Sequence, residues 1–178
     1  RQRALQMERL YPACTFRGIR GNVQTRLRKL EEEGYDGTLL AAAGLKRLGM
    51  EHAAGRYLSI DEMIPAAGQG ILAVQGRKGE IYDWISQVDD PASRAAALAE
   101  RQFIRVLGGG CTSPSAAHAQ INGNELKLTG LCWSEKSGQY SRGVLCADVS
   151  RAEQAGEELA KRLLREAERQ TVQRREES

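Results

Sequence analysis

Three strand-like segments in the second half of the chain constrain its fold most strongly. Residues 116–121, 125–132 and 140–147 each have the length and composition of a β-strand. The first two are separated by Asn122-Gly123-Asn124, and the last two by Lys136-Ser137-Gly138. Short turns of this kind reverse the chain direction. The pattern therefore predicts a three-stranded antiparallel meander.

One helix is expected before this meander in the sequence and another after it. Asp90 is a good N-cap and is followed by Pro91, which is favoured at the first helical position. Apolar residues then recur at helical spacing: Ala95, Ala99, Phe103 and Val106. Residues 150–153 form a capping-box pattern, and a second apolar stripe follows: Ala152, Ala155, Leu159 and Leu163. Residues 90–170 are thus predicted to form an α+β unit.

The first part of the chain favours alternating strands and helices. Cys14–Arg17 is expected to form a short strand, Asn22 to cap a helix, and Thr38–Ala42 to form a second strand. This is the pattern of a βαβ unit, in which ligands bind beyond the C-terminal strand ends, here near residues 18–22. A short helix is expected at residues 45–49, and a bend at residues 64–70 is expected to enter an apolar strand at Ile71–Val74.

Positive charge is concentrated near the start of the sequence. Residues 1–30 contain seven arginines and one lysine against the single acid Glu8, although the whole chain has a net charge of only +3. Because arginine grips carboxylates and phosphates with two parallel hydrogen bonds, we expect an acidic ligand here. Arg20 and Arg26 are the favoured ligand contacts. Arg28 and Lys29 could equally pair with the acids at 31–33.

Nucleic acid is an alternative ligand for such a basic segment. Only Tyr11 and Phe16 could stack on bases, and no nucleic-acid-binding motif is present. No nucleic-acid partner is therefore expected. No apolar stretch is long enough to cross a bilayer, so no membrane partner is expected either.

The chain has four cysteines, of which Cys111 stands in an unusual context. It follows Gly108–Gly110, which can leave a thiol open to a bulky partner, so it is a candidate covalent attachment point; the alternative is a small buried residue. The other three, Cys14, Cys132 and Cys146, fit that alternative. The sequence contains no CxxC pair, so zinc binding and dithiol redox chemistry are not expected. Scattered cysteines without a signal peptide favour a reducing cytoplasm, and the start at Arg1 suggests part of a longer polypeptide.

Several motifs, in order, resemble those of the hydroxymethylbilane synthase family, also called porphobilinogen deaminases. They are RGNVQTRLRKL at residues 20–30, LAAAGLKRLG at 40–49, PAAGQG at 65–70, AER at 99–101 and GGCTSP at 109–114. The resemblance extends from about Arg3 to the C-terminal helix.

The resemblance implies a transferase that joins four porphobilinogen molecules into hydroxymethylbilane with release of ammonia, in tetrapyrrole (haem) biosynthesis. It implies that Cys111 carries a covalent dipyrromethane cofactor, from which the chain of pyrroles grows. It further implies that the carboxylates of cofactor, substrate and growing oligopyrrole are bound by residues at matching positions: Arg3, Arg20, Arg26, Arg47 and Gln69.

The resemblance also implies a fold and a domain partition. The expected class is α/β, part of a periplasmic-binding-protein-like two-domain region, plus a C-terminal α+β domain. Residues 1–64 would be the latter part of domain 2, residues 65–88 the return segment of domain 1, and residues 89–178 domain 3, which carries Cys111.

The chain departs from the family pattern in two places. The family's paired arginines before the first helix are Gln2-Arg3 here, and no residue matches the family's catalytic aspartate. No catalytic residue is therefore assigned in this chain, and the isolated chain is expected to be inactive without the N-terminal part of the enzyme. The alternative is a non-catalytic carboxylate-binding module that keeps the arginines. The state of Cys111, blocked or free, discriminates the two.

Overall fold

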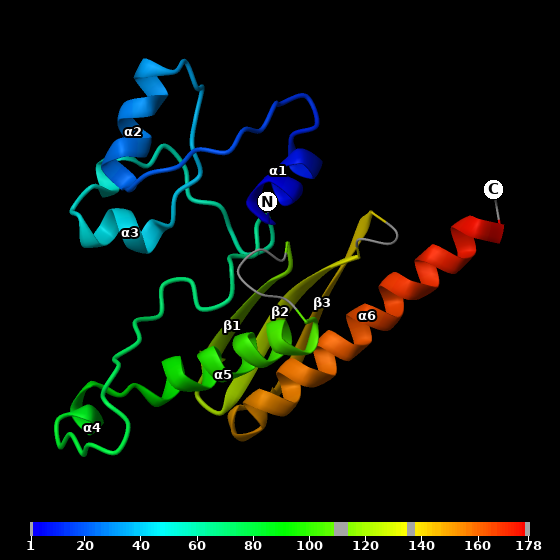
Figure 1. The fold of residues 1–178 in the computed structure, drawn as a ribbon. Coiled ribbons are helices and arrows are strands. Elements are labelled where there is room, and N and C mark those ends of the chain that lie inside the picture. Colours follow the sequence, from blue (N-terminus) through cyan, green and yellow to red (C-terminus); the bar gives the residue numbers. More distant parts are fainter. Residues whose placement is uncertain (1, 109–113, 135–137, 177–178) are drawn as a thin grey trace. The chain divides into compact units, whose positions relative to one another are not determined.

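The computed structural model describes residues 2–108, 114–134 and 138–176, and the chain divides into two compact units, residues 1–63 and residues 64–178. Figure 1 shows the elements in chain order. The second unit contains the predicted sheet, and the first contains helices joined by irregular segments.

The sheet of the second unit is the predicted antiparallel meander. Its strands are β1 (Ala116–Asn122), β2 (Glu125–Ser134) and β3 (Gln139–Asp148), in the order β1-β2-β3. Asn122 pairs with Glu125, so Gly123 and Asn124 form a two-residue turn, and Gly123 has the positive φ of 59° that such a turn favours.

Helices α5 (Pro91–Val106) and α6 (Ala152–Glu176) cover one face of this sheet (Figure 1). The predicted cap of α5 is confirmed, because the Asp90 carboxylate accepts a hydrogen bond from the Ser93 amide at 2.9 Å. At the other helix, the short 3₁₀ helix η2 (Val149–Arg151) precedes α6, and its capping side chain is Asp148, which accepts from the amide and hydroxyl of Ser150.

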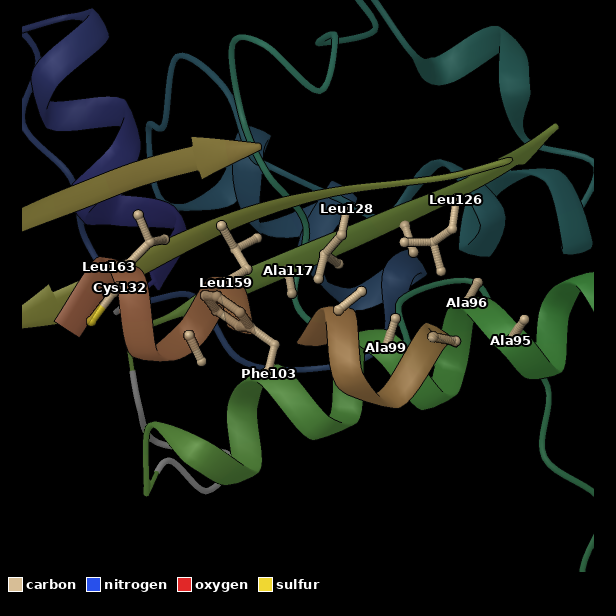
Figure 2. Packing of buried hydrophobic residues seen from close by; sticks show 14 residues of the cluster. Ala95, Ala96, Ala99, Phe103, Ala117, Leu126, Leu128, Cys132, Leu159 and Leu163 are labelled. Carbon is tan, nitrogen blue, oxygen red and sulfur yellow. The ribbon is translucent and has the colours of Figure 1, made fainter. Parts of the chain in front are cut away.

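The main core lies between the two helices and the sheet, as Figure 2 shows. Alternate residues of β2 point into it: Leu126, Leu128 and Cys132. Both predicted apolar stripes contribute to it, and Phe103, Leu159 and Leu163 are fully buried. Burying each of these large side chains contributes about 1.5–3 kcal/mol. Ala116 of β1 and Leu131 of β2 point to the opposite face of the sheet from the main core. There they form a smaller buried cluster with Ile64.

The first unit consists of α1 (Gln2–Leu10), α2 (Val23–Glu32), α3 (Ala42–Arg47) and the 3₁₀ helix η1 (Glu51–Ala53). The predicted helix after Asn22 is confirmed as α2. The predicted short helix is also present, although it begins earlier, at Ala42. Among residues 2–63 the only buried apolar side chains are Met7 and Leu45.

The predicted strands of the first unit are wrong for this structure. Residues 14–17 and 38–41 are irregular, and Ala42 already belongs to α3, so no βαβ unit forms. A strand persists where a neighbouring strand satisfies its backbone N–H and C=O groups. No strand is found among residues 2–63 to supply that pairing.

The segment that follows is also irregular, apart from the single turn α4 (Ile85–Val88). The strand predicted at Ile71–Val74 is absent, and several apolar side chains here are exposed: Leu72 by 75%, Val74 by 57% and Ile81 by 92%. The described sheet contains only β1, β2 and β3, so this segment is not paired with a strand of that sheet. Among the described residues, no helix is apolar over a length that could span a membrane.

Candidate functional site

The start of α2 is an exposed, capped turn that requires glycine. The Asn22 side chain accepts from the Thr25 amide at 2.8 Å, which caps the helix. Gly21 precedes it with a φ of 125°, and a Cβ there would lie 2.7 Å from the Thr25 side chain. The turn therefore requires glycine. The first amides of a helix have no partner within it and carry a partial positive charge, and here the residues around them, Arg20–Asn22 and Gln24, are exposed.

Arg26 and Arg3 bring two guanidinium groups to this region. Arg26 folds back along α2, and its Nε donates to the Gly21 carbonyl at 2.8 Å. Arg3, from α1, donates to the Leu39 carbonyl at 2.9 Å. Burial, and secondly the positive charge of Arg26, lower the pKa of Arg3. Two like charges held together are relieved by an anion, so this arrangement is suited to a carboxylate.

Three further basic residues of the segment behave in two ways. Arg28 pairs with Glu32 at 3.3 Å and Lys29 pairs with Glu33 at 3.2 Å, each one helical turn away. Arg28 and Lys29 thus pair with neighbouring acids, as one of the two sequence alternatives proposed. Surface ion pairs of this kind contribute little to stability. Arg20, in contrast, is exposed just before Gly21 and has no ion-pair partner within the described ranges.

Arg47 and Gln69 lie on other elements than Arg3 and Arg26. Arg47 is the last residue of α3, with an exposed side chain in the first unit. Gln69 is exposed on a turn of the second unit. Of the five predicted contact residues with described positions, the structure thus brings Arg3 and Arg26 together, with Arg20 next to the same helix start.

The turn around Gln69 has an anchor that the sequence reasoning missed. Glu100 of α5 is only 3% exposed, and one of its carboxylate oxygens accepts from the Gly68 amide at 2.6 Å. The other accepts from the Ala119 amide of β1 at 2.8 Å, and His118 Nδ1 lies 3.5 Å away. The signal was present in the sequence, because Glu100 is a charged residue between Ala99 and Phe103 on the apolar stripe.

The predicted attachment point, Cys111, lies outside the described residues. The other cysteines have free thiols. Cys132 is buried, as expected, and this burial raises its pKa to about 11, so it is a weak nucleophile at neutral pH. Cys14 and Cys146 are exposed, so the expectation that they are small buried residues is wrong. Among the described residues, no three metal-ligating side chains gather at one place.

Two family models match most of this chain. Residues 1–82 match the model described as "Porphobilinogen deaminase, dipyromethane cofactor binding domain". Residues 95–165 match the model described as "Porphobilinogen deaminase, C-terminal domain".

Curated relatives agree with these matches. A porphobilinogen deaminase of Ruminiclostridium josui is 45% identical over 162 residues, which cover 91% of this chain and 56% of the relative. One from Acetivibrio thermocellus is 44% identical over 94% of this chain and 57% of its own length. One from Roseiflexus castenholzii is 46% identical over 92% of this chain and 54% of its own length. The chain thus spans about half the length of these relatives.

Proposed function

Because the chain belongs to the porphobilinogen deaminase family, whose role lies in tetrapyrrole biosynthesis, we propose that it is part of a transferase that polymerises porphobilinogen. Four porphobilinogen molecules would be joined head to tail on the cofactor, and water would cleave the tetrapyrrole from it as hydroxymethylbilane. Each joining step forms one carbon–carbon bond and releases one ammonia. Bound dipyrromethane would supply the free pyrrole position to which the first porphobilinogen is added.

The paired guanidinium groups of Arg3 and Arg26 are the observation that supports this proposal most directly. Porphobilinogen and each ring added from it carry two carboxylates. Like-charged arginines beside an uncovered helix start suit such a ligand, since their attraction to carboxylate does not depend on a change of protonation. Arg20, Arg47 and Gln69 are proposed to contact further polar groups of cofactor, substrate and growing oligopyrrole.

We propose Cys111 as the attachment point of the dipyrromethane, through a thioether. The two exposed cysteines lack the glycine-rich context of Cys111, and the fourth cysteine is buried with a raised pKa. The thioether, once formed, would tie the cofactor to the second unit.

A complete active site is proposed to need sequence that this chain lacks. No residue here matches the family's catalytic aspartate, and the relatives extend well beyond the matched region. The exposed apolar side chains at 72, 74 and 81 would suit packing against that further part. On this proposal residues 65–88 return to domain 1 of a periplasmic-binding-protein-like region, residues 1–64 complete domain 2, and residues 89–178 form domain 3. The free cysteines fit a proposed cytoplasmic location.

The deciding experiment is intact-mass analysis of the chain co-expressed with the remaining part of a relative, followed by peptide mapping across Cys111. An adduct with the mass of dipyrromethane on Cys111, absent from Cys111→Ser, is the expected result. Release of ammonia from porphobilinogen should depend on the same adduct. An unmodified Cys111 in an assembled, folded complex would argue against the proposal.

The second candidate is a carboxylate-binding module without turnover. It is favoured by the arginine pair occurring in a chain that has no matched catalytic aspartate. In that case porphobilinogen would bind with Cys111 unmodified, and no ammonia would be released even with the remaining part present.

A further inference from the structure

A buried carboxylate joins three separate segments of the second unit. Glu100 lies on the core side of α5, accepts from Gly68 in the preceding turn, and accepts from Ala119 in β1. The three segments are distant in sequence, since 32 residues separate Gly68 from Glu100 and 19 separate Glu100 from Ala119. One side chain therefore fixes the turn relative to both the helix and the sheet.

The hydrogen bond from the Ala119 amide explains why position 100 carries a side chain that accepts hydrogen bonds. β1 is an edge strand of the described sheet, and the Ala119 amide bonds to Glu100 rather than to β2. The Ala119 residue is buried, so this amide would otherwise lack a partner away from water. A carboxylate between two amide donors is itself stabilised, because charge-assisted hydrogen bonds offset its loss of hydration.

The bond to Gly68 acts on the turn that presents Gln69. Gly68 and Gly70 have positive φ angles of 74° and 92°, which place Gln69 at the tip between two glycines. Within the turn, the Gln69 amide donates to the Ala66 carbonyl at 3.0 Å and the Ile71 amide to the Gly68 carbonyl at 3.1 Å. These local bonds shape the turn, whereas the 2.6 Å bond to Glu100 ties it to α5.

We propose that Glu100 is a positioning residue that holds the turn of residues 66–70, and with it Gln69, in the orientation used for ligand binding. What Gln69 contacts rests on the proposed function. The anchoring itself rests on the two amide bonds and on the burial of the carboxylate.

Glu100→Gln tests the anchor directly. Glutamine has the same shape but only one acceptor oxygen, so its NH₂ group must face one of the two amide donors. By NMR-detected hydrogen exchange in this chain, the amide of Gly68 or Ala119 should exchange about tenfold faster or more. Amides of α6 should be unchanged. Glu157→Gln removes an exposed carboxylate of α6 and should leave both amides as they are. Unchanged protection of Gly68 and Ala119 in Glu100→Gln would overturn the proposal.

A double-variant cycle on ligand affinity separates positioning from general stability. Each protein is co-expressed with the remaining part of a relative, and porphobilinogen is titrated into the complexes of the parent chain, Glu100→Gln, Gln69→Ala and the combined variant. If Glu100 acts through Gln69, the two single changes weaken binding similarly and the combined change adds little. Fully additive losses would overturn the link to Gln69. If the folded parent complex binds no porphobilinogen, the proposed function fails, and the exchange experiment still decides whether Glu100 anchors the turn.

Discussion

Gly156 of α6 lies directly against the backbone carbonyl of Ala99 in α5. A Cβ at position 156 would stand closer to that oxygen than real Cβ atoms approach, and it would also lie 3.0 Å from the Phe103 amide nitrogen. Both neighbours are backbone atoms of a regular helix, so they cannot rotate away. The close packing of α5 against α6, next to the core shown in Figure 2, therefore depends on this glycine.

Gly156→Ala should therefore destabilise the second unit although alanine is the better helix former. Overpacking against a fixed backbone costs about 1–3 kcal/mol, which exceeds the gain in helix propensity of about 1 kcal/mol. Urea unfolding followed by circular dichroism measures the loss. The exposed Gln154→Ala on the same helix serves as control and should change the free energy of unfolding very little. Equal or greater stability of Gly156→Ala would contradict the packing described.

The Cys132 thiol should remain unreactive in the folded chain. Burial raises its pKa from 9.0 to about 11, so little thiolate forms at about pH 8. Iodoacetamide should label the exposed Cys14 and Cys146 quickly and Cys132 only after unfolding, as read by peptide mapping. Rapid labelling of Cys132 under native conditions would show that this part of the core opens readily.

The same shift makes stability depend on pH in the alkaline range. The unfolded thiol loses its proton above about pH 9, whereas the folded thiol holds it until about pH 11. The folded state consequently loses up to about 2–3 kcal/mol of stability as the pH rises through this window. Cys132→Ala should be less stable at neutral pH but should lack this alkaline decline. A parallel decline in both proteins would assign it to other groups.

The second unit could be predicted from the sequence because its signals and its packing partners lie in the same stretch of chain. The cap at Asp90, the turn at Gly123 and the stripe ending in Leu163 are local patterns. The surfaces that they create bury one another, so local preference and tertiary packing agree. The strand predictions at 14–17, 38–42 and 71–74 failed because a strand also requires a neighbour, and the described residues offer none there.

The candidate site shows a similar limit. The sequence favoured Arg26 over Arg28 as a ligand contact, but it could not give the direction of either side chain. Arg26 turns back toward Gly21, whereas Arg28 pairs with Glu32. Glu100 itself stands out in the sequence as a charged residue on an apolar stripe, but its partners do not. Its partners are backbone amides, and every residue except proline carries one, so no residue type in the sequence marks where they converge.

The cap of α5 should respond to protonation. Hydrogen bonds from Ser93 hold the pKa of Asp90 below its ordinary value of 3.8, so the charged cap stabilises the fold at higher pH and loses this effect as the pH falls through the lowered pKa. Asp90→Ala should lower the melting temperature at about pH 7, and Asp90→Asn, which keeps an acceptor, should restore most of it. At about pH 2, the gap between the parent chain and Asp90→Ala should narrow. A gap independent of pH would show that the carboxylate charge is not involved.

Arg26 and Arg28 offer a matched pair for the proposed carboxylate site, because both lie on α2 and differ by two positions. The Arg26 guanidinium lies near that of Arg3 and beside Gly21, whereas Arg28 forms an exposed pair with Glu32. Arg26→Gln should weaken porphobilinogen binding by about tenfold or more, the scale of one charge-assisted hydrogen-bonded pair. Arg28→Gln removes the same charge and should weaken binding by less than about twofold, since an exposed charge is screened by solvent and salt. Isothermal titration of both variants measures the difference. Equal losses would mean that net charge, and not the geometry at the start of α2, attracts the ligand.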